Sequence, residues 1–330
     1  MSEKTTVIGD GGWGTALAMV LAENGHNVTV WGPFEENIEK VHKTGRNETF
    51  LPGIDLPQTI KWTSDRKEAA AADCIVLAVP TQFYIDVLNS FKGLISPDTG
   101  IVSVTKGLDR ETHRVMTDIA AEILGSKSVA ALSGPSHAEE VARRVPTAVV
   151  VASQDRSLAE YLQKLFTNGF FRVYTSSDTV GIQLGGALKN VIAIAVGISD
   201  GLGFGDNTRA ALITRGLAEM TRLGTSLGCT PETFSGLSGM GDLIVTCTSR
   251  HSRNRGVGER LGKGETLEEI MQSMQQVAEG VWNCGNARAL GAKLGVELPI
   301  TQEVYDILHN GADPAGAVKH LMGRELKPEV

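Results

Sequence analysis

The sequence predicts an α/β fold: an N-terminal, doubly wound parallel sheet followed by an all-α C-terminal domain. In the first half of the chain, short β-rich runs alternate with helical patterns, the order that builds a parallel sheet. Several of the runs are continuously apolar, as strands covered on both faces are. After Asp178 helical periodicity dominates and no convincing strand run follows. We therefore expect a boundary near 175–178, with one domain at 1–178 and another at 179–330.

Seven runs are the expected strands of the sheet. The first enters a glycine-rich turn, and an apolar helix at 15–23 follows, with Gly25 as its C-terminal stop. A second helix is expected at 138–143. The expected strands are 5–8, 27–31, 74–79, 101–105, 129–133, 148–152 and, as the last of the sheet, 170–174.

Length and composition limit the class of protein. At about 150 residues per domain, the 330 residues suggest two domains. Hydrophobic residues make up 42% of the chain, which is enough for a sizeable core. The net charge of −7 argues against a protein that coats nucleic acid, since such proteins normally have a basic domain or face. A local basic pocket for a small phosphorylated ligand is still compatible with this charge.

Cysteine usage and hydropathy indicate a soluble, cytoplasmic protein. The chain has 4 cysteines and no CxxC pair, so a reducing compartment is a simpler interpretation than a disulfide framework or a zinc site. The N-terminus has no long apolar region typical of a signal peptide. The longest strongly apolar stretch, 191–198, has 8 residues, whereas about 20 are needed to span a bilayer. We therefore expect no membrane insertion.

A glycine-rich loop, Gly9-Asp-Gly-Gly-Trp-Gly14, follows the first expected strand and opens the first helix. In this βαβ context the GxGxxG spacing is typical of a Rossmann-type dinucleotide-binding turn. Gly9 would allow the tight turn, Gly11 the approach of a pyrophosphate, and Gly14 the close packing of helix on strand. The helix N-terminus would present free N–H groups to the phosphates. The alternative is a glycine-rich turn that binds nothing.

The end of the second expected strand leaves the choice between NAD and NADP open. An Asp or Glu usually stands there and binds the adenine ribose. Here the sequence is Trp31-Gly-Pro-Phe34, and Glu35 and Glu36 come slightly late. No Arg stands at Gly32 or Pro33 to bind a 2′-phosphate either. Charge at this point therefore selects neither cofactor.

Lys189 is the only charged residue between Asp178 and Asp200, in a run so apolar that its helix must be buried on nearly all sides. A buried ammonium usually has a carboxylate partner, a lowered pKa, or both. A lowered pKa is what a lysine acid/base catalyst needs near neutral pH. The alternative is a lysine that reaches the surface or forms a structural ion pair. The small residues at 185–187 favour the catalytic interpretation, because they would leave room for a ligand.

Asp242 is the candidate carboxylate partner of this lysine. It lies in a glycine-flanked turn at 239–243 that precedes an apolar run. An acid in such a position ordinarily serves the turn itself, which is the alternative.

Three further segments could hold a phosphorylated ligand. The basic cluster 250–255 stands out from the acidic chain, and Ser252 or Asn254 could cap a helix whose start, beside an Arg, suits a phosphate dianion. The segment 133–136 and Lys106 each follow an expected strand, at the edge where open α/β sheets bind ligands. A solvated basic turn and plain loops are the respective alternatives.

Taken together, these segments resemble the NAD(P)-dependent glycerol-3-phosphate dehydrogenases of the bacterial biosynthetic type. The resemblance extends from about residue 5 to about residue 323, and the number of blocks in the same order makes it specific. The blocks are 9–16 (GDGGWGTA), 50–53 (FLPG), 105–108 (TKGL), 133–136 (SGPS), 183–190 (QLGGALKN), 207–217 (NTRAALITRGL), 239–243 (GMGDL), 246–248 (TCT) and 252–255 (SRNR).

The resemblance implies the interconversion of sn-glycerol 3-phosphate and dihydroxyacetone phosphate with NAD or NADP, without a metal. It implies that Lys189 is the acid/base catalyst, which accepts the proton when glycerol 3-phosphate is oxidised. Lys106 and Arg253 would contact both substrate and cofactor. The other implied substrate contacts are Gly134, Ser136, Asn190, Asp242, Thr246, Ser252 and Asn254. The other implied cofactor contacts are Gly9, Gly11, Gly12, Trp13, Gly14, Pro33, Ala138, Val277 and Glu279.

Two positions depart from the family pattern. Arg or His is common where this chain has Pro33, which weighs against an NADP preference and keeps NAD open. Many relatives carry Phe in place of His137, a change that we expect to be tolerated. The family further implies a homodimer and a supply of glycerol 3-phosphate for phospholipid synthesis. Two alternatives are a Rossmann-type dehydrogenase acting on a hydroxy acid and a catalytically silent sensor of NAD(H).

Overall fold

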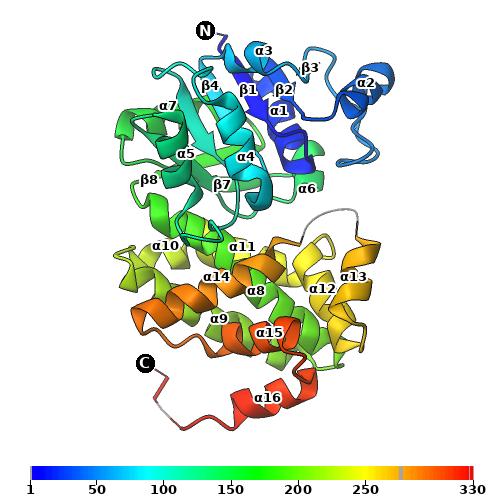
Figure 1. The fold of residues 1–330 in the computed structure, drawn as a ribbon, viewed down its shortest axis with the longest axis vertical. Helices are drawn as coiled ribbons and strands as arrows, with labels where there is room; N and C mark the ends of the chain where they lie inside the picture. The colour runs from blue at the N-terminus through cyan, green and yellow to red at the C-terminus, as the bar shows by residue number, and fades with distance from the viewer. Residues whose placement is uncertain (1, 275–277, 327, 330) are drawn as a thin grey trace.

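The computed structural model describes residues 2–274, 278–326 and 328–329. A sheet with helices on both faces forms the N-terminal part, and a group of helices packed around α8 forms the C-terminal part (Figure 1). The strands are β1 (Lys4–Ile8), β2 (Asn27–Trp31), β3 (Lys61–Thr63), β4 (Cys74–Leu77), β5 (Gly100–Ser103), β6 (Val129–Ser133), β7 (Thr147–Ala152) and β8 (Phe171–Ser176).

The strand order is β3-β2-β1-β4-β5-β6-β7-β8, with the direction of winding reversing at β1, as in a doubly wound sheet. The predicted α/β class is confirmed, but a fully parallel sheet is wrong, because β7 pairs antiparallel with β6. The helix between these two strands, α6 (Ala138–Ala142), has 5 residues. It is about 7.5 Å long, too short to return the chain along a strand of about 16 Å. The longer α7 (Arg156–Phe166) does return it, and β8 is parallel to β7.

Strand β3 was absent from the sequence prediction. It has 3 residues, of which Trp62 and Thr63 are buried, and it pairs with β2 at the edge of the sheet. A run this short has no periodicity that could be recognised. The other strands agree with the expected runs within a few residues; β8 ends two residues later, at Ser176.

Helices cover both faces of the sheet because successive strand side chains point to opposite sides. Val7 packs into a cluster with residues of α1, α2 and α7, whereas the next residue, Ile8, packs with residues of α3, α4 and α5. The bounds of these helices not yet given are α1 (Gly12–Glu23), α2 (Glu35–Thr44), α3 (Arg66–Ala70), α4 (Thr81–Phe91) and α5 (Met116–Leu124).

The helical part begins three residues after β8, at Thr179. The division into domains at 1–178 and 179–330 stays a prediction, with which this change of secondary structure agrees. The elements are α8 (Thr179–Gly201), α9 (Asp206–Ser226), α10 (Pro231–Ser235), the π-helical turn η1 (Leu237–Gly241), α11 (Asp242–Thr248), α12 (Arg253–Gly262), α13 (Leu267–Ser273), α14 (Glu279–Leu294), α15 (Pro299–His309) and α16 (Pro314–Met322).

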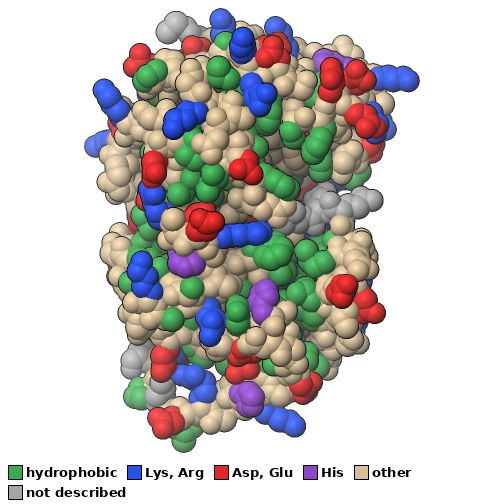
Figure 2. Space-filling view, in the orientation of Figure 1, with side chains coloured by type: hydrophobic (Ala, Val, Ile, Leu, Met, Phe, Trp, Pro, Cys, Tyr) green, Lys and Arg blue, Asp and Glu red, His purple; other side chains and the backbone are tan. Residues whose placement is uncertain are grey.

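Helix α8 is the centre of the helical core, and its residues from Gly181 to Ser199 are all buried. Within the described residues it is the one helix whose length and composition would suit a membrane span. All of its apolar window is buried inside the protein, however, as in the core helix of a globular protein. On the face drawn in Figure 2, acidic and basic side chains are interspersed over both parts.

Glycines let α8 and α12 approach with their backbones in contact. A Cβ at Gly197 of α8 would collide with the carbonyl oxygen of Arg255, and a Cβ at Gly258 of α12 would collide with that of Ile194. Because backbone atoms cannot move aside as a flexible side chain can, both positions require glycine. The contact holds α12 against the C-terminal half of α8, and Asn254 on the first turn of α12 reaches Asn190 of α8 at 2.9 Å.

We predict that Gly258→Ala lowers the free energy of unfolding by at least about 1–3 kcal/mol, because the added methyl overpacks this contact. The measurement is urea unfolding followed by circular dichroism. Gly256→Ala, on the same helix, is the matched control, since among the described residues no atom outside its own helix lies within 4 Å of a Cβ built there. It should be neutral or stabilise by less than about 1 kcal/mol. Equal stability of the two variants would contradict the close crossing of α8 and α12.

Candidate active site

The glycine loop follows β1 and opens α1, as predicted. Gly9 has a φ of 118°, and a Cβ there would lie 2.5 Å from the carbonyl oxygen of Ala78. A Cβ at Gly14 would collide with the carbonyl oxygen of Gly9. Gly11 caps α1 without a side-chain hydrogen bond, and among the described residues no atom beyond its own chain neighbours lies within 4 Å of a Cβ built on it. The first N–H groups of a helix have no backbone acceptor within the helix, so the start of α1 at this glycine loop fits a dinucleotide pyrophosphate.

The remaining predicted cofactor residues of the N-terminal part surround this loop. A Cβ at Gly12 would lie 2.5 Å from the carbonyl oxygen of Phe50 and 3.8 Å from Cβ of Ala138, so the start of α6 approaches the start of α1. Trp13 is partly buried against the core of the sheet. Pro33 is exposed directly after β2. All of these residues lie near the carboxyl ends of β1, β2 or β6.

Glu279 links the helical part to the sheet part. Its Oε1 accepts hydrogen bonds from the backbone N and the Oγ1 of Thr81, at 3.3 and 3.2 Å, so the first residues of α14 and α4 meet. Burial raises the pKa of Glu279, while the bonds from Thr81 and the charge of Arg253 act against the rise. The predicted contact Val277 lies outside the described residues.

Lys189 lies in the buried middle of α8 with 6% of its surface exposed, so the alternative of a lysine that reaches the surface is wrong. Its Nζ donates to Oδ1 of Asp242 and, at 2.8 Å, to Oγ1 of Thr246. Thr246 Oγ1 in turn donates to the backbone oxygen of Asp242 at 2.6 Å, one helical turn earlier on α11. The proposed carboxylate partner is therefore in place, and the threonine fixes its geometry.

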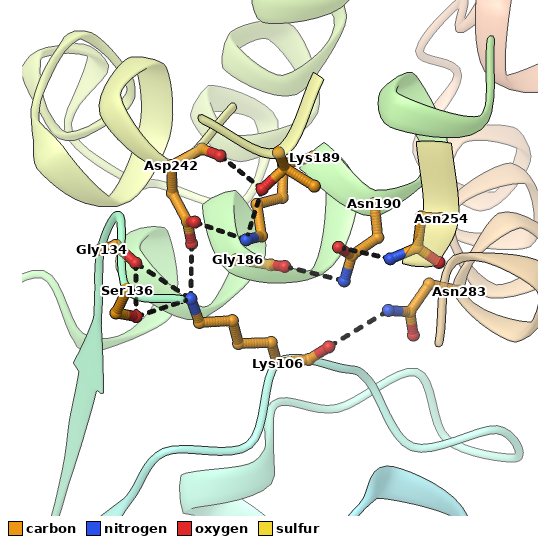
Figure 3. Close-up of polar contacts among 10 residues, drawn as sticks. Lys106, Gly134, Ser136, Gly186, Lys189, Asn190, Asp242, Asn254 and Asn283 are labelled. Atoms are coloured by element: carbon orange, nitrogen blue, oxygen red, sulfur yellow. Dashed lines mark hydrogen bonds and ion pairs between the residues drawn. The ribbon is translucent and has the colours of Figure 1, made fainter. Parts of the chain in front are cut away.

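A second lysine shares the same carboxylate (Figure 3). Lys106, in the loop after β5, donates from Nζ to Oδ2 of Asp242 at 2.8 Å, to the carbonyl oxygen of Gly134 at 2.9 Å and to Oγ of Ser136 at 3.3 Å. The side chains of Asp242 and Lys189 are 1% and 7% exposed, and that of Lys106 is 17% exposed, so the network is largely withdrawn from water. Two ammonium groups around one carboxylate leave an excess positive charge, which suits an anionic ligand.

Burial has the largest effect on the ionisation of Lys189. It lowers the pKa of the ammonium to about 8, with the charge of Lys106 acting in the same direction and Asp242 opposing both. Burial also lowers the pKa of His137, and the charge of Lys189 adds to that effect. A lysine with a pKa near 8 can both give and take a proton at physiological pH.

The predicted substrate residues of α8 and α12 form a second, connected group. Asn190 accepts at Oδ1 a hydrogen bond of 2.9 Å from Nδ2 of Asn254, whose Oδ1 accepts one of 2.9 Å from the backbone N of Gly280. Ser252 caps α12, with its Oγ accepting from the N of Arg255 at 3.2 Å. Arg253, the first residue of that helix, is exposed.

Two local interpretations require correction. The glycines before Lys189 do not leave free space: a Cβ at Gly185 would lie 2.5 Å from the carbonyl oxygen of Ser238, and one at Gly186 would lie 2.9 Å from Oγ of Ser133. They allow η1 and the Lys106 side chain to pack against α8. Asp242 does not lie in a turn, because it is the first residue of α11, directly after η1.

Sequence reasoning missed two asparagines of α14. Asn283 donates from Nδ2 to the carbonyl oxygen of Lys106 at 3.2 Å (Figure 3), and Asn286 donates to that of Leu108 at 3.0 Å. Both are buried and anchor the loop that carries Lys106 to the helical part. Their spacing of three residues puts them on one helix face, a signal that could have been noticed but that names no ligand.

Comparisons with known proteins identify the family of this chain. Family models described as the N-terminus and C-terminus of NAD-dependent glycerol-3-phosphate dehydrogenase match residues 4–159 and 178–319. A glycerol-3-phosphate dehydrogenase (NAD(P)+) of Bacillus cereus is 50% identical over 99% of this chain and 97% of its own length.

Solved structures of the same enzyme also resemble this chain. The glycerol-3-phosphate dehydrogenase of Coxiella burnetii is 41% identical, with a TM-score of 0.94 over 98% of this chain and 99% of that one. The enzyme of Saccharomyces cerevisiae is 30% identical, with a TM-score of 0.84 over 97% and 99%. The predicted resemblance is confirmed, and the chain belongs to the family of NAD(P)-dependent glycerol-3-phosphate dehydrogenases.

Proposed function

We propose that this protein interconverts dihydroxyacetone phosphate and sn-glycerol 3-phosphate with NAD(H) or NADP(H), and that Lys189 is its acid/base catalyst. The observation that carries the proposal is the buried Lys189–Asp242–Lys106 network next to the dinucleotide loop. The segment from Ser136 to Ala138 connects the two sites, since Ser136 accepts from Lys106 and Ala138 approaches Gly12. A ligand held at the network would therefore lie close to a dinucleotide bound at α1.

The bound nicotinamide supplies the hydride for reduction or accepts it in oxidation. In the reductive direction, protonated Lys189 stabilises the oxyanion that develops at the carbonyl oxygen and gives it a proton. In the oxidative direction, neutral Lys189 takes the hydroxyl proton. Thr246 and Asp242 hold the Nζ of Lys189 in one orientation, so little reorganisation is needed as the charge develops.

The pKa of Lys189 gives the reaction a direction-dependent pH profile. With the pKa lowered to about 8, reduction loses its proton donor as the pH rises through that value. Oxidation gains its base over the same interval. As the pH rises through the pKa of Lys189, the rate of reduction is therefore expected to fall and the rate of oxidation to rise.

The phosphate of the substrate is assigned to the start of α12. An Arg at a helix N-terminus would combine its guanidinium with the N–H groups of the first turn that Ser252 does not already accept from, a combination that suits a phosphate. Lys106 adds a second cation at the Asp242 carboxylate. Binding energy from the phosphate would orient the carbonyl against Lys189, which raises the rate of the chemical step.

This proposal predicts that the enzyme discriminates strongly against an unphosphorylated substrate. With either NADH or NADPH, kcat/KM for dihydroxyacetone should be at least about tenfold below that for dihydroxyacetone phosphate, because the cations lose their partner. Steady-state absorbance at 340 nm measures both, and the two cofactors are compared in the same assay. Turnover of a hydroxy acid but not of dihydroxyacetone phosphate would support a hydroxy-acid dehydrogenase instead. Binding of NADH without any turnover would support a catalytically silent sensor of NAD(H).

Further proposals follow from the family resemblance and not from the site. We infer a cytoplasmic location, a homodimeric state, and a supply of glycerol 3-phosphate for phospholipid synthesis. A single measurement by light scattering of the purified chain would test the oligomeric state.

A further inference from the structure

Asp10 lies between Gly9 and Gly11 of the dinucleotide loop, and it takes no part in the site contacts described above. It is 6% exposed, and its Oδ2 accepts a hydrogen bond of 2.7 Å from Nδ2 of Asn37 on α2. A Cβ built on Gly32 would lie 2.6 Å from both Cγ and Oδ2 of Asp10. The carboxylate therefore occupies the space directly against the residue that follows β2.

That space is where a dinucleotide fold usually places an acid. An Asp or Glu at the end of β2, about 20 residues after the glycine loop, accepts a hydrogen bond from the adenine ribose. In this chain the residues at that point are Gly32 and Pro33. The acids that come later are exposed on the first turn of α2, where Glu36 is paired with Lys40 at 2.8 Å.

We propose that Asp10 supplies the ribose-binding carboxylate from the glycine loop, and that it makes the site select NAD(H) over NADP(H). The inference rests on the proposed dehydrogenase function. A carboxylate accepts hydrogen bonds from a ribose diol, whereas it repels a 2′-phosphate. Pro33 offers neither a cation nor an N–H group that could offset this repulsion.

The surrounding contacts hold Asp10 in place. Nδ2 of Asn47 donates to the backbone oxygen of Asp10 at 2.7 Å and to Oγ1 of Thr15 at 2.9 Å, so the loop is tied to a buried amide. Within the described residues, Asn37 is the one side chain that donates to the carboxylate. Burial raises the pKa of Asp10, and the hydrogen bond from Asn37 opposes the rise. A carboxylate withdrawn from water in this way interacts strongly with a nearby ligand charge.

The test is equilibrium binding of NADH and of NADPH to the full-length protein without substrate, measured by calorimetry at one ionic strength. The wild type should bind NADH at least about tenfold more tightly than NADPH. In Asp10→Asn, the ratio of the two dissociation constants should fall to within about threefold, through weaker NADH and tighter NADPH binding. Asn can still accept from Asn37, so this variant preserves the link to α2; Asp10→Ala is the second variant.

Glu35→Gln is the matched control, since it removes one acidic charge from the exposed start of α2 and leaves the loop intact. In Glu35→Gln, the ratio of the NADH and NADPH dissociation constants should equal that of the wild type. If both Asp10 variants had native circular dichroism and an unchanged ratio of the NADH and NADPH dissociation constants, Asp10 would have only a structural role and the proposal would be overturned. An equal change of this ratio in Glu35→Gln would also overturn it. Binding requires no turnover, so an error in the proposed reaction would instead appear as selective NADH binding without reduction of dihydroxyacetone phosphate.

Discussion

Replacing Lys189 with alanine or methionine is expected to lower kcat for dihydroxyacetone phosphate reduction by at least ~10²-fold, because the reacting oxygen loses its proton donor. Methionine keeps a straight side chain of similar length, so the core around α8 stays filled. Fluorescence titration should show that nicotinamide binding survives, since the loop that binds the dinucleotide is formed by β1 and α1 and not by α8.

Lys319→Ala is the control for this experiment. Lys319 is exposed on α16, which lies at the opposite end of the molecule from the sheet (Figure 1), and its loss should leave kcat unchanged. Near-normal turnover in a folded Lys189→Met variant would remove Lys189 from the acid/base role. A loss of turnover together with a loss of NADH binding would point to a structural role instead.

Asp242→Asn is expected to have an effect of the same order, ~10²-fold on kcat, together with a shift of the pH profile. The carboxylate raises the pKa of Lys189 against the effect of burial, so its removal should lower that pKa further below about 8. Reduction needs the protonated lysine, and its rate should therefore begin to fall at a lower pH than in the wild type. The measurement is kcat/KM for reduction across about pH 6–10.

Asp98→Asn is the matched control, because it removes one acidic charge at an exposed position away from the network. Its pH profile should coincide with that of the wild type. If Asp242→Asn lowered the rate without moving the midpoint, Asp242 would act only by holding the fold together. Breaking a buried ion pair costs about 3–5 kcal/mol, so thermal unfolding of each variant has to accompany the kinetics.

The fold was predictable where the pattern is local. The strands and α1 follow from hydrophobic runs and nearby glycines, and each of these patterns spans only a few residues of the chain. The direction of β7 was not predictable in this way, because the segment 134–146 is long enough for a parallel crossover, and only the short length of α6 within it keeps the chain from crossing. Strand β3 was missed because its three residues acquire their strand geometry from pairing with β2.

The site was predictable in part. The isolation of Lys189 in an apolar run indicated a buried ammonium, and the structure bears this out. The sequence did not show that Lys106 and Lys189 share the carboxylate of Asp242, since Lys106 and Asp242 are 136 positions apart. Asp10 is part of a recognised motif, yet the spacing says only that any residue is tolerated there. Its approach to Gly32 appears only once α1, β2 and α2 are assembled.

Local order was therefore encoded in the chain itself: which segments are strands or helices, where a dinucleotide loop begins, and which lysine has to be buried. Those properties depend on side-chain spacing and on the cost of placing a charge among apolar residues. The tertiary structure alone decided which carboxylate neutralises which lysine and which acid stands at the end of β2. Such contacts join residues far apart in sequence, and they exist only where packed elements bring the charges within hydrogen-bond distance.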